Sequence, residues 1–149
     1  MSYRDVFGEI LADHYESPRN WGKVADPTRE ELGFNPLCGD KICISMKLKG
    51  EQIEACQFEG EGCSICMASA SIMTEKMQGH SVTEATDLIE AFRKKMQGEE
   101  NVAGLPADDS EDDLVALYGI KRFPVRIKCA LLAWTTLKKA INGGQSEHA

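Results

Sequence analysis

The strongest constraint on the fold is an alternation of apolar and polar residues over positions 40–49, followed by a change of period. The apolar members of this alternation are Ile42, Ile44, Met46 and Leu48. Such a pattern predicts a β-strand with one buried face and one wet face. Gly50-Glu51 is typical of a tight hairpin turn, and residues 52–59 return as a second strand. The apolar positions of this second strand fall out of phase, which either a β-bulge or burial on both faces would explain.

Helical periodicity replaces the alternation on both sides of this hairpin. Ser81-x-x-Glu84 is a capping box at the start of one helix, and Pro124 suits the first turn of the last one. Helices are expected over residues 3–16, 64–78 and 82–97, around 114–117, and from 124 to about 142, with a short strand around 31–34. The chain therefore predicts an α+β fold, in which helices pack on a small antiparallel sheet of about three strands. We expect one domain over residues 1–149, with about 144–149 as a flexible tail.

Composition excludes several classes of function. With 149 residues, 42% of them hydrophobic, the chain suits a single domain with an ordinary core. A net charge of −7 and the lack of a basic run argue against nucleic-acid and membrane surfaces. The N-terminus lacks an apolar signal core, and no segment approaches the length of a membrane span, so we expect a cytoplasmic protein. In that compartment the six cysteines are reduced, metal-bound or redox-active rather than paired in structural disulfides.

Three cysteines and one aspartate lie in local contexts that suit metal ligands: Cys38, Asp40, Cys63 and Cys129. Cys38 and Asp40 are two apart in a turn, so in an extended segment their side chains point the same way. Cys63 follows a Gly-x-Gly at a helix start, and Cys129 lies one turn inside the last helix. If the fold brings them together, they form a Cys3Asp tetrahedron with a charge of about −4, which suits Zn²⁺ or iron.

Each of these positions also has a simpler interpretation. The Cys38–Asp40 pair is compatible with an Asx-type turn, and a cysteine such as Cys63 is often a small buried hydrophobic residue. Arg126 lies three residues before Cys129, where its charge would lower the thiol pKa, although it could instead pair with the acids of residues 108–113. Cys66, at Cys-x-x-Cys spacing from Cys63, is either a spare thiol near the site or a core residue.

Four segments in the same order resemble the U-type iron–sulfur cluster assembly proteins, the IscU and NifU N-terminal family. The segments are Asp13-His14-Tyr15 with Ser17-Pro18-Arg19-Asn20, Asn35-Pro36-Leu37-Cys38-Gly39-Asp40, Phe58-Glu59-Gly60-Glu61-Gly62-Cys63-Ser64-Ile65, and Phe123-Pro124-Val125-Arg126-Ile127-Lys128-Cys129-Ala130. Lys128 replaces the histidine that IscU proteins carry before the last cysteine, and the acidic segment 99–120 resembles an insertion of the SufU branch. Cys66 departs from the small, non-thiol residue that is usual at this position.

The resemblance implies an exposed metal site on an α+β fold, with Cys38, Asp40, Cys63 and Cys129 as its ligands. It further implies a zinc-dependent sulfur acceptor, a sulfurtransferase-like carrier that serves a PLP-dependent, SufS-like cysteine desulfurase and downstream iron–sulfur assembly or acceptor proteins. On this hypothesis Cys38 accepts the persulfide sulfur and Arg126 stabilises negative charge. Two alternatives stay open on the same residues: a scaffold for a [2Fe–2S] cluster, or iron, on these ligands, and a purely structural zinc module.

Overall fold

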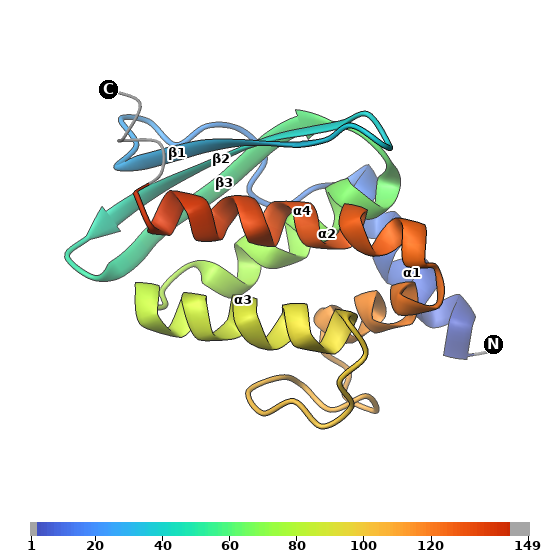
Figure 1. Cartoon of the computed structure of the whole chain (residues 1–149). Coiled ribbons are helices and arrows are strands. Elements are labelled where there is room, and N and C mark those ends of the chain that lie inside the picture. Colours follow the sequence, from blue (N-terminus) through green and yellow to red (C-terminus); the bar gives the residue numbers. More distant parts are fainter. Residues whose placement is uncertain (1–2, 144–149) are drawn as a thin grey trace.

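A three-stranded antiparallel sheet with helices packed against one of its faces makes up the protein (Figure 1). This computed structural model describes the backbone of residues 3–143 and the side chains of residues 8–143. The elements, in chain order, are α1 (Tyr3–Glu16), β1 (Arg29–Asn35), β2 (Asp40–Lys49), β3 (Gln52–Glu61), α2 (Ser64–Met77), α3 (Val82–Met96), the 3₁₀ helix η1 (Asp113–Arg122) and α4 (Pro124–Ile141). The predicted α+β class is confirmed, and the tail expected at 144–149 lies outside the described residues.

The sheet has the strand order β1-β2-β3, so both of its connections are hairpins. The β1–β2 hairpin closes on the pair Asn35–Asp40, which places residues 36–39 in the turn. The β2–β3 register slips between Lys47 and Leu48, because Lys47 faces Ala55 whereas Leu48 faces Ile53. One extra residue in β3 therefore restores the burial of Ile53 on the core face. Of the two explanations for the phase of this strand, the bulge is the one that the structure adopts.

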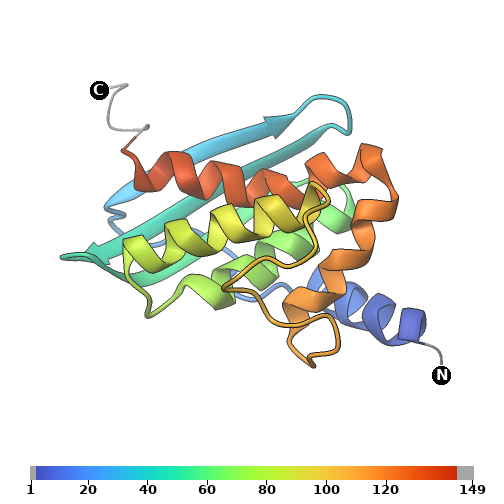
Figure 2. The ribbon, with the colours of Figure 1, turned by 60° about the horizontal axis from the view of Figure 1, so that its bottom comes forward.

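Helices α2 and α4 cover the core face of the sheet, and α3 packs on the far side of α4 (Figures 1 and 2). Trp134 of α4 is fully buried, and its ring stacks on Phe92 of α3 with 4.3 Å between centroids. Its indole N–H donates to the Ser69 hydroxyl of α2 at 2.9 Å, and that hydroxyl donates to the Ala130 carbonyl at 2.6 Å. A single buried hydroxyl thus joins α2 to α4 at two points.

Local signals in the sequence account for several element boundaries. The predicted capping box is present, since Ser81 and Glu84 each bond to the other's backbone N–H. Pro124 occupies the first turn of α4, where its missing N–H leaves no helical hydrogen bond unmade. In α4, Ile127 and Ile141 are only partly buried against the core, whereas Leu131 is buried. Within residues 3–143, no helix combines the length and the apolar character that a membrane crossing demands.

Candidate metal centre

The three chain segments that carry the candidate ligands meet at one end of the sheet. The β1–β2 turn carries Cys38, and Asp40 is the first residue of β2. Cys63 follows β3 and caps α2, while Cys129 lies in the second turn of α4. In Figures 1 and 2 this is the end where the β1–β2 turn lies beside the start of α4. Residues separated by up to 91 positions along the chain are therefore neighbours in space.

The side chains of Cys38, Asp40 and Cys129 each offer a ligand atom, and these three atoms lie within 4.8 Å of one another. The two sulfurs of Cys129 and Cys38 are 3.2 Å apart. Cys63 lies outside this mutual group, although its sulfur is 3.8 Å from Oδ2 of Asp40. Four Zn²⁺ ligands at about 2.0–2.3 Å from the ion would be roughly 3.3–3.8 Å apart in a tetrahedron. The spacing of Cys38, Asp40 and Cys129 is compatible with such an ion, and the sulfur of Cys63 would have to move closer to complete the tetrahedron.

Two groups hold the Asp40 carboxylate in place. The backbone N–H of Cys63 donates to Oδ1 of Asp40 at 2.8 Å, and the Asn35 amide donates to Oδ2 at 3.4 Å and to the Cys129 sulfur at 3.6 Å. Asp40 is 1% exposed, so its charge is shielded from water and depends on these donors. Asn35 opens the sequence motif that contains Cys38, but its contacts with Asp40 and Cys129 arise only in the folded structure.

Gly62 permits this approach of Cys63 to Asp40. A Cβ atom at Gly62 would lie 2.4 Å from Oδ1 of Asp40 and 3.0 Å from its Cα atom. The φ angle of Gly62 is +156°, which side chains rarely adopt. Gly62, which precedes Cys63, therefore allows the segment after β3 to pack closely against Asp40. The Gly-x-Gly before Cys63 is visible in the sequence, but its contact with Asp40 is visible only in the fold.

Burial and the neighbouring thiols make the thiolate form of Cys129 unfavourable without a cation. Burial raises the pKa of the Cys129 thiol, and its hydrogen bonds with Cys38 and Cys63 raise it further. The Arg126 guanidinium faces this cluster: its pKa is raised by a hydrogen bond with Cys129 and by the charges of Cys63 and Cys38. A cation held among three thiols and a carboxylate would reverse this effect on the thiols. The chemistry of the donor set thus fits a bound divalent metal ion.

Three of the five acids of the 108–113 segment pair with residues other than Arg126, which bears on the alternative interpretation of Arg126. Asp108 pairs with Lys95 at 2.7 Å, and Asp112 pairs with Lys76. Asp113 accepts from His14, with 2.7 Å between Nε2 and Oδ2. Arg126 instead lies beside the thiols, on the helical face that its spacing from Cys129 predicts.

A second group of potential ligand atoms contains His14, Glu75 and Asp113, again within 4.8 Å of one another. His14 is fully buried, and its Nδ1 lies 2.7 Å from the Ser71 hydroxyl. Both ring nitrogens of His14 are thus already in hydrogen bonds with protein groups. The cluster links α1, α2 and η1.

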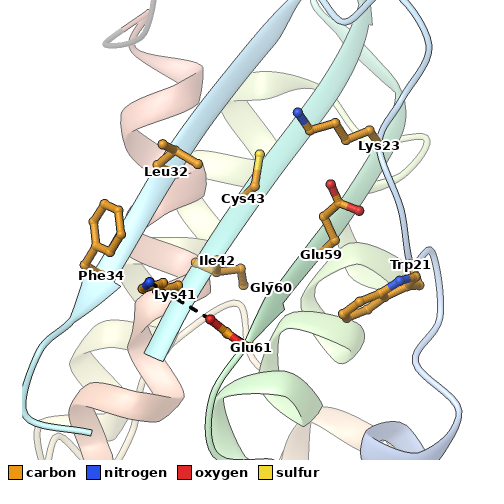
Figure 3. A pocket seen from close by; sticks show the side chains of 10 residues that line it. All are labelled: Trp21, Lys23, Leu32, Phe34, Lys41, Ile42, Cys43, Glu59, Gly60 and Glu61. Carbon is orange, nitrogen blue, oxygen red and sulfur yellow. Dashed lines mark ion pairs between the residues drawn. The ribbon is translucent and has the colours of Figure 1, made fainter. Parts of the chain in front are cut away.

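The open face of the sheet carries a groove of about 590 Å³, which does not contain the cysteine cluster. Figure 3 shows Trp21, Leu32 and Phe34 around this groove, with the ion pair of Lys41 and Glu61 at 4.0 Å. Cys43 also lines it, and burial, followed by the charge of Glu30, raises the pKa of this thiol to about 11. The thiol of Cys43 is therefore protonated at neutral pH. Cys43 is thus a residue of β2 on the groove side of the sheet, outside the candidate ligand set.

Fold and site together define a small α+β protein whose cysteine–aspartate cluster lies at one end of a three-stranded sheet. Residues 6–147 match the family described as the NifU-like N-terminal domain. The chain therefore belongs to this family.

Two similar proteins are described with different roles. The chain is 44% identical over 138 residues to the zinc-dependent sulfurtransferase SufU of Bacillus subtilis, covering 91% of this chain and 89% of that protein. It is 39% identical over 136 residues to the iron–sulfur cluster assembly scaffold protein IscU of Streptococcus pyogenes, covering 91% and 82%. A solved structure from Fervidobacterium islandicum, described as a candidate assembly scaffold for the SUF system, superposes with a TM-score of 0.81 at 28% identity. That comparison covers 94% of this chain and 99% of the other.

Proposed function

We propose that this protein acts in iron–sulfur cluster biogenesis as a zinc-dependent sulfur acceptor that takes persulfide sulfur from a cysteine desulfurase. The observation that carries this proposal is the cluster of Cys38, Asp40 and Cys129 with Cys63 beside it, in a chain 44% identical to a zinc-dependent sulfurtransferase. These four residues are the proposed ligands. When bound, zinc would hold thiols in the deprotonated, nucleophilic form at neutral pH.

Cys38 is the proposed sulfur acceptor because of its position and exposure. It lies on the β1–β2 turn and is partly exposed, whereas Cys129 is fully buried in α4. The Cys38 thiolate attacks the outer sulfur of the persulfide on the desulfurase. A new S–S bond forms to Cys38, the S–S bond of the donor breaks, and the donor cysteine leaves as a thiolate. Arg126, whose guanidinium faces the thiols, stabilises the negative charge that this exchange carries into the site.

The surroundings of Cys38 support contact with a partner protein. Leu37 and Val125 are 73% and 69% exposed, and Phe34 and Phe123 are more than half exposed. These side chains belong to the segments that carry Cys38 and Cys129. Exposed apolar side chains on the segments that carry a site are candidates for contact with a partner protein. A PLP-dependent, SufS-like desulfurase that covers them would also keep water away from the transferred sulfur, which then passes to downstream assembly or acceptor proteins.

The test is stimulation of desulfurase turnover by the zinc-loaded protein. Wild type and the control variant Cys43→Ala, which removes a half-buried thiol of the open sheet face, are expected to raise turnover equally. Cys38→Ala is expected to give no stimulation and no persulfide on the chain, because the attacking sulfur is absent. Full stimulation by Cys38→Ala would rule out Cys38 as the acceptor.

A scaffold for a [2Fe–2S] cluster is the second candidate, because the chain is also 39% identical to an IscU scaffold and the thiols suit either group. Anaerobic purification with metal analysis separates the two. Bound zinc with desulfurase activation supports sulfur transfer, whereas a visible-absorbing cluster that moves intact to an apo-protein supports the scaffold. Zinc with neither behaviour would leave a structural zinc module.

A further inference from the structure

Cys66 is a buried thiol beside the candidate metal centre that the proposed ligand set does not use. It lies in the first turn of α2 and is 0% exposed. Its backbone N–H donates to the Cys63 sulfur at 3.4 Å, so Cys63 is the N-cap of α2 and Cys66 is three residues further along. The sequence left open whether Cys66 is a core residue or a thiol near the site. In the structure Cys66 is both buried and adjacent to Cys63.

This placement suits a disulfide between the two residues. A helix turn brings residues three apart onto the same side, at a Cα separation of about 5–6 Å, which is the usual range for a disulfide. Cys63 is partly exposed and is the N-cap residue at the start of α2. Cys66 lies behind it, away from solvent. An outside reagent therefore meets Cys63 first, and Cys66 is positioned to react second.

Among the other thiols, Cys129 also neighbours Cys63, but it is fully buried, and a bond between these two would join α4 to the start of α2. Cys43 lies on the open face of the sheet, and Cys56 is buried on the core face of β3, where it faces Met46. Cys38 and Cys129 lie 3.2 Å apart and form the competing pair. A disulfide between them would tie the β1–β2 turn to α4, whereas the Cys63–Cys66 bond closes within one helix turn.

We propose that Cys63 and Cys66 form a reversible redox pair that controls the ligand set. The Cys63 thiolate attacks a low-molecular-weight disulfide, giving a mixed disulfide on Cys63 and releasing one thiolate of the reagent. Cys66 then gives up its proton and attacks the Cys63 sulfur, which expels the second reagent thiolate and leaves the Cys63–Cys66 disulfide. The two protein thiols are oxidised and the reagent is reduced to two thiols. A reducing thiol reverses both steps.

The consequence for the metal rests on the proposed function, in which Cys63 is a ligand. A disulfide sulfur is no longer a thiolate donor, so oxidation reduces the four donors to three and weakens metal binding. Metal content then depends on the thiol–disulfide balance of the surroundings. The two cysteines that cause this redox dependence of metal content lie within one turn at the start of α2.

The test equilibrates metal-free and zinc-loaded protein anaerobically in mixtures of reduced and oxidised glutathione. A Cys56→Ser background removes the other thiol of the same tryptic peptide, and Cys66→Ser is compared with it. Alkylation and peptide mass spectrometry are expected to find a Cys63–Cys66 disulfide, with no fragment ions between the two residues, that a dithiol reduces. With a chromophoric chelator present, Cys66→Ser is expected to slow zinc release roughly tenfold, because the reaction stops at the reversible mixed disulfide.

Three results would overturn the proposal: alkylated Cys66 under oxidising conditions, Cys38–Cys129 as the main disulfide, or equal zinc release with and without Cys66. Cys66→Ala is a second variant in case the serine disturbs the core, and circular dichroism checks both for folding. Disulfide mapping in the metal-free protein separates this inference from the proposed function. If the Cys63–Cys66 disulfide forms in a chain that binds no zinc, the result supports the proposed redox pair and contradicts the proposed metal centre.

Discussion

Replacing Gly62 by alanine tests the packing that holds the candidate centre together. The new Cβ would lie 2.4 Å from Oδ1 of Asp40, so the carboxylate must move and lose its 2.8 Å bond from the Cys63 N–H. A hydrogen bond to a charged group contributes about 1.5–3 kcal/mol to stability. A side chain at a positive φ costs roughly 1 kcal/mol more. We therefore expect Gly62→Ala to lower the free energy of unfolding by about 2.5–4 kcal/mol.

Gly104→Ala is the matched control for this prediction. Gly104 has a φ of +89°, and nothing lies within 4 Å of its Cβ position, so only the backbone cost of roughly 1 kcal/mol applies. Urea unfolding of both metal-free variants measures the difference, and chelator competition measures zinc affinity. Gly62→Ala should be less stable than the control and should bind zinc more weakly. Equal stability and equal zinc affinity for the two variants would refute the close contact between Gly62 and Asp40.

Two further predictions concern the core and the surface. Ser69→Ala leaves the buried Trp134 indole N–H without its acceptor, so urea unfolding should show a loss of about 1–3 kcal/mol, and an unchanged free energy of unfolding would contradict the buried hydrogen bond. The hydrogen bond from Lys138 is the main cause that lowers the pKa of Glu90 to about 2, from 4.5 in the unfolded chain. Because the folded-state pKa is the lower one, this contribution to stability is present above about pH 4.5 and is lost as the pH falls towards 2. Glu90→Gln should thus reduce stability by less than about 1 kcal/mol at pH 7, and the difference should shrink by pH 3; a difference that grows on acidification would contradict this sign.

Local patterns in the sequence predicted much of the fold because local interactions determine those parts. The alternation over 40–49 matches both ends of β2, and the capping box and Pro124 mark the starts of α3 and α4. The bulge in β3 stayed undecided, since the same pattern is compatible with two-sided burial and only the register with β2 distinguishes them. The 3₁₀ helix η1 is longer than the short helix expected around 114–117, because its buried residues pack on α1 and α4.

The candidate site was predicted as a set of residues but not as an arrangement. Local context pointed to Cys38, Asp40, Cys63 and Cys129, yet their convergence depends on the hairpin, the β3–α2 junction and the start of α4 meeting at one end. The contacts of Asn35 with the carboxylate and a thiol arise from tertiary packing, which the sequence alone does not encode in any local pattern. The position of Cys66 behind Cys63 likewise required the structure.

X-ray absorption at the zinc edge of the metal-loaded protein probes the coordination shell itself. Three sulfur neighbours at about 2.3 Å and one oxygen neighbour at about 2.0–2.2 Å are expected, with one sulfur fewer in Cys129→Ser. Four sulfur neighbours, or imidazole nitrogens in place of thiols, would contradict a centre built from Cys38, Asp40, Cys63 and Cys129.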